Sequence, residues 1–189
     1  AYYNAPSSAF GMPELQVSLY PDQGQQRIVE IKLTYPYTSS ELEQRKADLN
    51  QWLDTLGASL NAPSTDARIQ AAAQAICACG SYDPEGGSTV CSLMDDARAD
   101  SEGFALAMAA LCQDIGLSYR VVEGTRNGHP HFWNMVQSST GWRHLDLTAP
   151  EEGLYPLRTD QNMSELGYQW DTDLVPVSAS VEEGAGTAG

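Results

Sequence analysis

Three short stretches in the second half of the chain carry reactive side chains in a fixed order. They read Ala99-Asp100-Ser101-Glu102-Gly103-Phe104-Ala105, then His131-Phe132-Trp133-Asn134, and then His144-Leu145-Asp146-Leu147-Thr148. A hydroxyl at the start of an apolar segment is followed by an imidazole and a carboxylate, the order found in enzymes that use a cysteine nucleophile. Serine stands where such an enzyme carries its thiol. These stretches therefore predict where a catalytic site lies. The serine leaves open whether that site is active.

The segment that begins at Ser101 is predicted to be a buried helix. Residues 101–115 place apolar side chains inward at Phe104, Ala105, Met108, Leu111 and Cys112. Gly116 stands where a helix of this kind takes its left-handed terminal residue. A group in the first helical turn lies near unpaired N–H groups and the positive end of the helix dipole. This position lowers the pKa of a thiol, and here it is occupied by a hydroxyl.

Three antiparallel strands are predicted after this helix, over residues 117–123, 131–137 and 141–147. If the second hairpin turns at Ser138 and Ser139, His131 faces Asp146 on the neighbouring strand. The register could slip by one or two residues, so this pairing supports proximity and nothing finer. A carboxylate beside an imidazole fixes the ring tautomer and stabilises the charged ring, as in a catalytic triad.

The first half of the chain combines a hairpin with helices. Residues 15–20 and 27–35 alternate with period two, and Pro21-Asp22-Gln23-Gly24 supplies turn residues between them. Thr38, Ser39 or Ser40 can cap a helix that runs to about Leu56, and a second helix begins after Ser64 or Thr65. By composition, residues 80–87 form a loop.

These elements predict an α+β fold in which helices pack against an antiparallel sheet, with an N-terminal hairpin and helix added. The expected division is a linker over residues 1–13, the hairpin and helix over 14–63, the core over 64–178 and a flexible tail over 179–189. The small, polar and aromatic opening resembles a linker after a processing site, which indicates export. No apolar run approaches the roughly 20 residues of a membrane span.

Charge narrows the range of partners. The chain has 189 residues and a formal net charge of −15. Nucleic acids and anionic lipids favour clustered Lys and Arg, so neither is expected as a partner. The acidity keeps the surface solvated and does not itself indicate a ligand.

The cysteines and histidines allow two further interpretations. Cys77, Cys79, Cys91 and Cys112 match neither a zinc finger nor a redox pair, so buried free thiols or one ordinary disulfide are expected. His129, His131, His144 and Asp146 could converge from adjacent strands as zinc ligands. The triad explains His131 and Asp146 without a metal, and we therefore expect no metal and no cofactor.

Further motifs resemble the transglutaminase-like superfamily in its bacterial form, which has a papain-like Cys-His-Asp fold. The resemblance covers roughly residues 66–176 and includes the helix, histidine and aspartate stretches quoted above. Its other motifs are Tyr82-Asp83, Gly116-Leu117 with Arg120-Val121-Val122-Glu123-Gly124, Trp142 before Leu145-Asp146-Leu147-Thr148, and Gly167-Tyr168-Gln169-Trp170-Asp171 with Pro176. The departure from the family pattern is Ser101 at the nucleophile position.

The resemblance implies that Ser101, His131 and Asp146 occupy the catalytic positions. It also implies a cleft that recognises a peptide or an amide-bearing polymer, and we expect Tyr82, Trp133 and Trp170 to contact this ligand. The expected module is secreted or held at a bacterial cell surface, in association with the cell wall, and is inactive or weakly active. The alternatives are an active Ser-His-Asp amide or ester hydrolase, and a thiol enzyme whose cysteine has been exchanged for serine.

Overall fold

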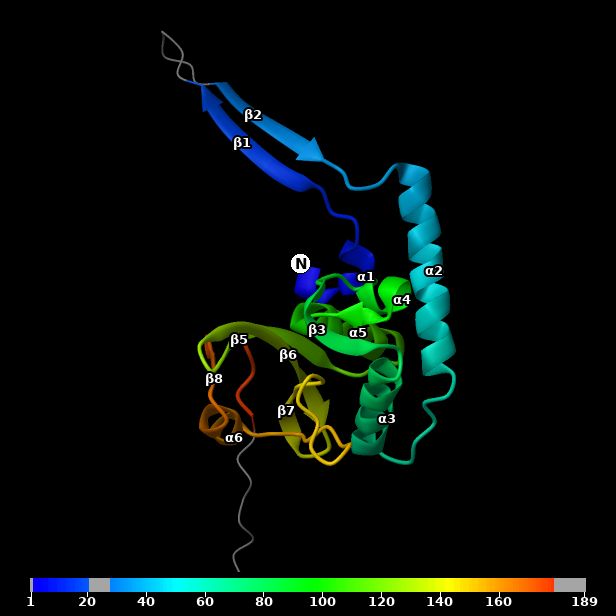
Figure 1. Ribbon diagram of the computed structural model, residues 1–189, viewed down its shortest axis with the longest axis vertical. Helices are drawn as coiled ribbons and strands as arrows, with labels where there is room; N and C mark the ends of the chain where they lie inside the picture. Colours follow the sequence, from blue (N-terminus) through cyan, green and yellow to red (C-terminus); the bar gives the residue numbers. More distant parts are fainter. Residues whose placement is uncertain (1, 21–27, 179–189) are drawn as a thin grey trace, which may run out of the picture.

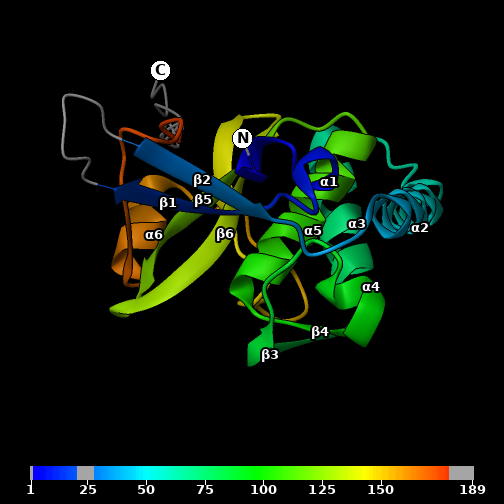
Figure 2. The same ribbon diagram turned by 90° about the horizontal axis from the view of Figure 1, so that it is seen from above.

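The computed structural model describes residues 2–20 and 28–178. Its centre is a four-stranded sheet in the order β7-β6-β5-β8, built from β5 (Tyr119–Arg126), β6 (His129–Ser138), β7 (Gly141–Leu145) and β8 (Tyr168–Trp170). Neighbouring strands are antiparallel. Helix α5 (Ser101–Asp114) packs against this sheet, and α2 (Ser39–Gly57) and α3 (Thr65–Cys77) lie on its other side (Figures 1 and 2). The predicted α+β architecture is confirmed.

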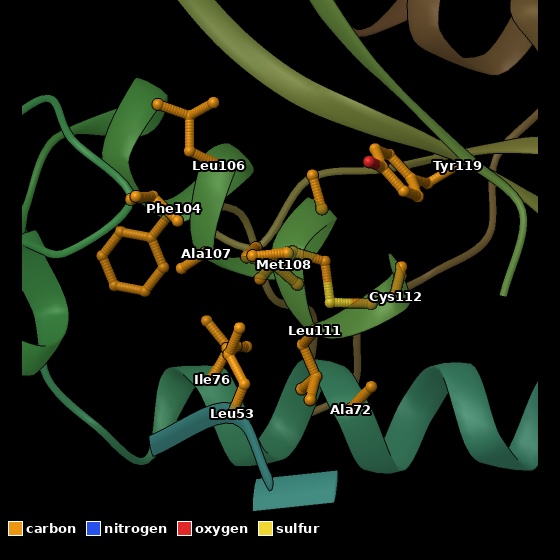
Figure 3. Packing of buried hydrophobic residues seen from close by; sticks show 14 of the residues in the cluster. Leu53, Ala72, Ile76, Phe104, Leu106, Ala107, Met108, Leu111, Cys112 and Tyr119 are labelled. Carbon is orange, nitrogen blue, oxygen red and sulfur yellow. The ribbon is translucent and has the colours of Figure 1, made fainter. Parts of the chain in front are cut away.

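Helix α5 is the centre of the hydrophobic core. All its residues from Gly103 to Cys112 are buried. A helix that is apolar on every side must be enclosed on every side. Figure 3 shows Met108 and Leu111 among side chains from α2, α3 and β5, which include Leu53, Ile76 and Tyr119. The sheet and helices therefore fix the position of the α5 N-terminus from all directions.

Side-chain caps define the starts of helices α2 and α3. Thr38 forms a capping box with Glu41 at the start of α2. Ser64 accepts a hydrogen bond from the backbone N–H of Ala67 at the start of α3. Hydrogen-bonding side chains at these positions satisfy N–H groups that the helix leaves free. Both helix starts lie among the candidates predicted from the sequence.

The β6–β7 hairpin differs in register from its prediction. Ser138 pairs with Gly141 and Asn134 pairs with Leu145, so the turn residues are Ser139 and Thr140 instead of Ser138 and Ser139. The pairing is therefore shifted by two residues, so the position opposite His131 is that of Thr148 and not that of Asp146. Because side chains alternate with period two, a two-residue shift keeps His131 and Asp146 on the same face. His131 and Asp146 therefore lie close together as predicted, although the predicted register is wrong.

The N-terminal residues pack on the core instead of forming the expected linker over 1–13. The short helices η1 (Tyr2–Asn4) and α1 (Pro6–Ala9) adjoin α5, and Phe10 is buried in the main hydrophobic cluster. The hydroxyl of Tyr119 donates a hydrogen bond to the backbone O of Asn4 (2.8 Å). Aromatic side chains in this segment pack against apolar partners. The composition of the segment, which is typical of a linker, does not predict this packing.

The predicted N-terminal hairpin forms from β1 (Glu14–Tyr20) and β2 (Ile28–Thr34). Its strands pair with each other and extend away from the body of the molecule (Figure 1). The predicted turn at residues 21–24 and the predicted tail over 179–189 lie outside the described residues. Helix α2, grouped with the hairpin in the sequence, contributes the buried Leu49 and Leu53 to the core.

Two segments that the sequence does not predict to be regular form strands and helices in the structure. The expected loop over residues 80–87 contains β3 (Ser81–Gly87), which pairs in parallel with β4 (Arg98–Ala99) through an interrupted register, and α4 (Ser92–Asp96) follows β3. Near the C-terminal end, α6 (Asp160–Glu165) precedes β8. The tertiary neighbours supply the backbone pairing that these glycine-rich and polar sequences do not predict. In the described part of the chain, no helix is long and apolar enough to cross a membrane.

Candidate active site

Ser101 is the first residue of α5, and its position is fixed by the residue before it. The Asp100 carboxylate accepts a hydrogen bond from the backbone N–H of Gly103 (2.9 Å) and another from the hydroxyl of Ser88 (2.5 Å). Ser101 is 8% exposed. Its Oγ accepts a hydrogen bond from the backbone N–H of Phe132 (3.2 Å). The hydroxyl therefore joins the start of the helix to strand β6.

His131 and Asp146 form a buried pair beside this helix start. The His131 Nε2 atom lies 2.8 Å from Asp146 Oδ2. An ionised carboxylate only accepts hydrogen bonds, so this contact assigns the ring proton to Nε2. When the ring is neutral, Nδ1 then carries the lone pair that a general base requires, and when the ring is charged both nitrogens carry a proton. The predicted pairing of histidine and carboxylate is present.

Four hydrogen bonds hold the Asp146 carboxylate. Besides His131, the hydroxyl of Tyr168 donates to Oδ2 (2.7 Å), and the N–H and the hydroxyl of Thr148 both donate to Oδ1 (2.8 Å each). Burial on its own would raise the pKa of Asp146. The hydrogen bond and charge of His131, together with the Tyr168 and Thr148 hydrogen bonds, outweigh burial and lower this pKa. Asp146 is therefore a stable anion that orients the imidazole.

The contact that a triad also needs, between nucleophile and base, is missing. Within residues 2–20 and 28–178, the only hydrogen-bond partner of the Ser101 hydroxyl is the Phe132 N–H, and the ring of His131 is not a partner. The structure thus places Ser101, His131 and Asp146 in one region and joins only the last two directly.

No cysteine of the described chain can replace the missing thiol. All four cysteines are free. Cys91 and Cys112 are buried in the core, and burial raises their thiol pKa to about 11 and about 12. Burial likewise raises the pKa of Cys77 to about 11, and it raises the pKa of Cys79 above its ordinary value. A thiol with such a pKa is almost entirely protonated near neutral pH and is a poor nucleophile.

The three aromatic residues expected to contact a ligand differ in accessibility. Tyr82 on β3 is 44% exposed, and it pairs with Ala99 just before the start of α5. Trp170 is partly buried and packs edge-on against Trp133 (5.9 Å between ring centroids). Trp133 is 1% exposed, so its ring is enclosed and presents no face to a ligand. Its expected role in ligand binding is replaced by packing in the core.

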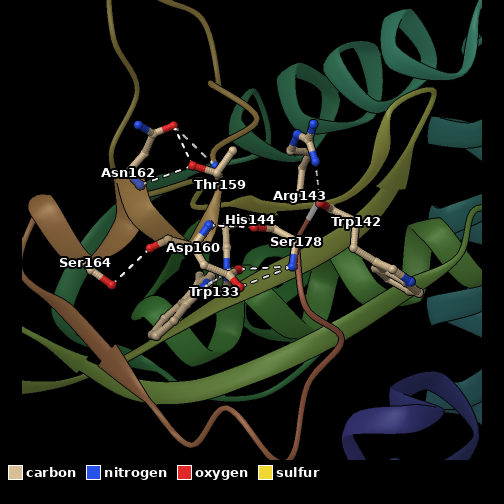
Figure 4. Close-up of polar contacts among 9 residues, drawn as sticks. All are labelled: Trp133, Trp142, Arg143, His144, Thr159, Asp160, Asn162, Ser164 and Ser178. Atoms are coloured by element: carbon tan, nitrogen blue, oxygen red, sulfur yellow. Dashed lines mark hydrogen bonds and ion pairs between the residues drawn. The ribbon is translucent and has the colours of Figure 1, made fainter. Parts of the chain in front are cut away.

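A second histidine–carboxylate pair supplies the hydrogen-bond acceptor for the buried Trp133 indole (Figure 4). The Trp133 indole donates to His144 Nδ1 (2.9 Å), and His144 Nε2 lies 2.8 Å from Asp160 Oδ1. Burial lowers the pKa of His144 below its ordinary value despite the hydrogen bond and charge of Asp160. The backbone N–H of Ser178 also donates to the Asp160 carboxylate.

In the described residues, three of the zinc candidates considered from the sequence have other hydrogen-bond partners. Both ring nitrogens of His144 are already hydrogen-bonded, and His131 Nε2 is directed to Asp146. His129 is exposed at the start of β6. In the described ranges, no group of three or more His, Cys, Asp or Glu residues is placed to hold a metal ion.

Sequence reasoning missed two residues that complete the site. Tyr168 and Thr148 hydrogen-bond Asp146, and neither was assigned to the site from the sequence. Each lies in a motif of the family resemblance, and that membership was the available signal. Their partner could not be identified because Tyr168 reaches Asp146 across 22 residues of chain.

Comparison with known proteins identifies the family and the fold. The family model described as the transglutaminase-like superfamily matches residues 32–147. A crystal structure of a TGase is similar, with a TM-score of 0.50 and 18% sequence identity, over 81% of this chain and 48% of that chain. At this identity the likeness shows the fold alone, and the chain spans about half the length of that TGase. None of the curated protein sequences compared with the chain matches it.

Two further solved structures are similar at lower TM-scores. One is a putative cysteine protease from Cytophaga hutchinsonii, with a TM-score of 0.46 and 12% identity over 77% of this chain and 66% of that chain. The other is the periplasmic domain of TgpA from Pseudomonas aeruginosa bound to ethylmercury, with a TM-score of 0.41 and 19% identity over 65% of this chain and 56% of that chain.

Proposed function

Because the chain belongs to the transglutaminase-like superfamily, we propose that it is a binding module of this superfamily that recognises a peptide or another amide-bearing polymer and does not complete acyl transfer. One observation carries the proposal. Among the described residues, the hydroxyl of Ser101 is hydrogen-bonded to the N–H of Phe132 and not to His131, the base that would have to remove its proton.

The chemistry of the hydroxyl supports this proposal. A thiol has a pKa of about 8.5, and a helix N-terminus next to an imidazole can convert it to a thiolate. An alcohol is far less acidic, and the helix dipole contributes only about 0.3–2 kcal/mol. Serine must therefore lose its proton to a base during attack, while donors stabilise the oxyanion. The Ser101 geometry offers no direct contact for that proton transfer.

The retained histidine–carboxylate pair has a structural role under this proposal. Asp146 follows β7 and His131 lies in β6, so their hydrogen bond ties the end of one strand to the start of its neighbour. The exposed Tyr82 lies close enough to this region that the charge of Asp146 contributes to raising its pKa, after burial. We assign Tyr82 to ligand contact at the mouth of the site.

Exchange of Ser101 for cysteine tests the proposal. The S101C variant is expected to gain rapid iodoacetamide labelling at residue 101 near neutral pH, while S101A and the native chain gain none. Further exchange of His131 for Ala in the S101C background should slow this labelling. The native chain and S101A should bind the same members of a panel of glutamine- and asparagine-containing peptides, measured by calorimetry.

An active serine hydrolase is the second candidate. The observation in its favour is the ring tautomer of His131, which leaves Nδ1 free to accept a proton. Labelling of native Ser101 by a fluorophosphonate, absent in S101A, would establish this candidate and overturn the binding proposal. A gene that encodes cysteine at codon 101 would instead identify a thiol enzyme exchanged to serine.

The cellular location completes the proposal. We place the module outside the cytoplasm of a bacterium, at the cell surface or in association with the cell wall. Fractionation of the source cells followed by immunoblotting tests this placement. Detection in the cytoplasmic fraction alone would contradict it.

A further inference from the structure

One face of the β1–β2 hairpin is entirely apolar. The strands pair Leu15 with Leu33, Val17 with Ile31 and Leu19 with Val29, and alternation places these six side chains on one face. Each of them is between 49% and 63% exposed. Aliphatic side chains in a hairpin normally pack against another layer. Here the described chain supplies no layer over them.

The opposite face is polar. It carries Glu14, Gln16, Ser18, Tyr20, Glu30, Lys32 and Thr34, with Ile28 as its apolar member. The hydroxyl of Tyr20 donates a hydrogen bond to Glu30 (3.0 Å) on this face. Such a separation of apolar from polar side chains is typical of a sheet with one covered and one solvated face.

The hairpin is also isolated from the rest of the fold. Its two strands form a sheet of their own, and Figure 1 shows them extending beyond α1 and away from the four-stranded sheet. A two-stranded hairpin alone is marginally stable in water and needs packing against a further element. A contiguous apolar patch of this size on a soluble chain marks an interaction surface.

We propose that this face packs against the same face of a second copy of the chain, which forms a two-fold symmetric dimer. Side chains of this size each carry on the order of 100 Å² of apolar surface, and if most of it is covered, six of them contribute roughly 500 Å² per copy. Two paired faces then bury about 1,000 Å², the size at which a specific interface begins. The resulting pair of stacked hairpins supplies the second layer that each lacks.

Charge favours a second copy at this face over contact elsewhere. The formal net charge of the chain is −15, so most surfaces of two copies repel each other. The described hairpin strands carry only Glu14, Glu30 and Lys32, and all three lie on the polar face. A two-fold interface requires a surface that is complementary to itself, and an uncharged apolar face meets this condition.

Sedimentation equilibrium of the full chain over a range of concentrations tests the proposal. The native chain should sediment as a dimer of the 20.5 kDa chain. The central pair of the face, Val17 and Ile31, is exchanged for Lys in a V17K/I31K variant. Two charges at the centre of an apolar interface should weaken dimerisation by about 100-fold or more, since truncating central contacts alone has effects of this order.

Matched variants separate loss of the interface from loss of the fold. The S18K variant adds a charge on the polar face of the same strand, opposite Glu30, and should remain dimeric. V17K/I31K and V17E/I31E should each be monomeric with native circular dichroism, and their mixture should recover a heterodimer. These variants leave Ser101, His131 and Asp146 unchanged, so the outcome is independent of the proposed function.

Three results would overturn the proposal. A native chain that stays monomeric at about 100 µM, well above the micromolar range of weak specific complexes, would exclude it. A V17K/I31K variant that still dimerises would place the interface elsewhere. A monomeric native chain that floats with phosphatidylcholine vesicles, while V17K/I31K does not, would assign the face to a lipid surface.

Discussion

The carboxylate of Asp146 offers the sharpest test of how the candidate site is held together. In Asp146→Asn the side chain keeps its shape, but it has one acceptor oxygen where Asp146 has two. The native oxygens receive His131 and Tyr168 on one side and two donors of Thr148 on the other. In either amide orientation, two donors therefore face an NH₂ group.

The expected cost follows from these two unpaired donors. A buried donor without a partner costs about 1–3 kcal/mol. Rotation of a hydroxyl relieves part of this cost, so Asp146→Asn should lower the free energy of unfolding by about 2–4 kcal/mol. This is a large share of the roughly 5–15 kcal/mol by which a domain is stable. Urea denaturation monitored by tryptophan fluorescence at pH 7 measures the difference.

Acidification should reduce the difference between the native chain and Asp146→Asn. The pKa of Asp146 is lowered in the folded chain, where hydrogen bonds and the charge of His131 outweigh burial. Its ionisation therefore stabilises the fold above the unfolded pKa of about 3.9, and this contribution is lost as pH falls through the lower folded pKa. The two unfolding curves should converge below about pH 4.

The exposed Asp48, which accepts a hydrogen bond from Gln44 (2.8 Å), provides the control. Asp48→Asn should change the free energy of unfolding by less than about 0.5 kcal/mol. A loss below about 1 kcal/mol for Asp146→Asn would refute the four-bond account of this carboxylate, because even one unpaired buried donor costs that much.

Two further changes test the packing behind the site. His144→Phe removes the acceptor of the buried Trp133 indole, so the free energy of unfolding should fall by about 1–3 kcal/mol in the same urea assay, and an unchanged value would contradict this role. Gly124→Ala places a Cβ 2.2 Å from the backbone O of Gln169, where β8 pairs with β5. Overpacking of this kind costs about 1–3 kcal/mol, and a thermal midpoint equal to that of the native chain would refute the close approach.

The helical part of the fold was predictable because its signals are local. The caps at Thr38 and Ser64 and the apolar spacing within each helix depend on residues three or four positions apart. The same holds for Gly116, which has the left-handed conformation (φ 71°) expected after α5. Such signals do not require knowledge of what packs against the helix.

Segments whose structure depends on distant partners were predicted poorly. Residues 81–87 read as a loop because of their glycines and proline, and they become β3 only by pairing with β4. Trp133 read as a possible ligand contact, and it is buried with an indole N–H whose acceptor, His144, lies farther along the chain. Composition does not specify which side chains a strand will meet.

The sequence alone determined three features: the order of Ser101, His131 and Asp146, the helix that begins at Ser101, and the alternating strands. It could do so because periodicity, capping and residue type are properties of neighbouring positions. The tertiary structure alone decided that the hairpin register shifts by two residues and that Tyr168 and Thr148 complete the Asp146 hydrogen bonds. It also directed the Ser101 hydroxyl to the Phe132 N–H. These contacts join residues from separate elements, and only the packing of α5 against the sheet brings them within hydrogen-bonding distance.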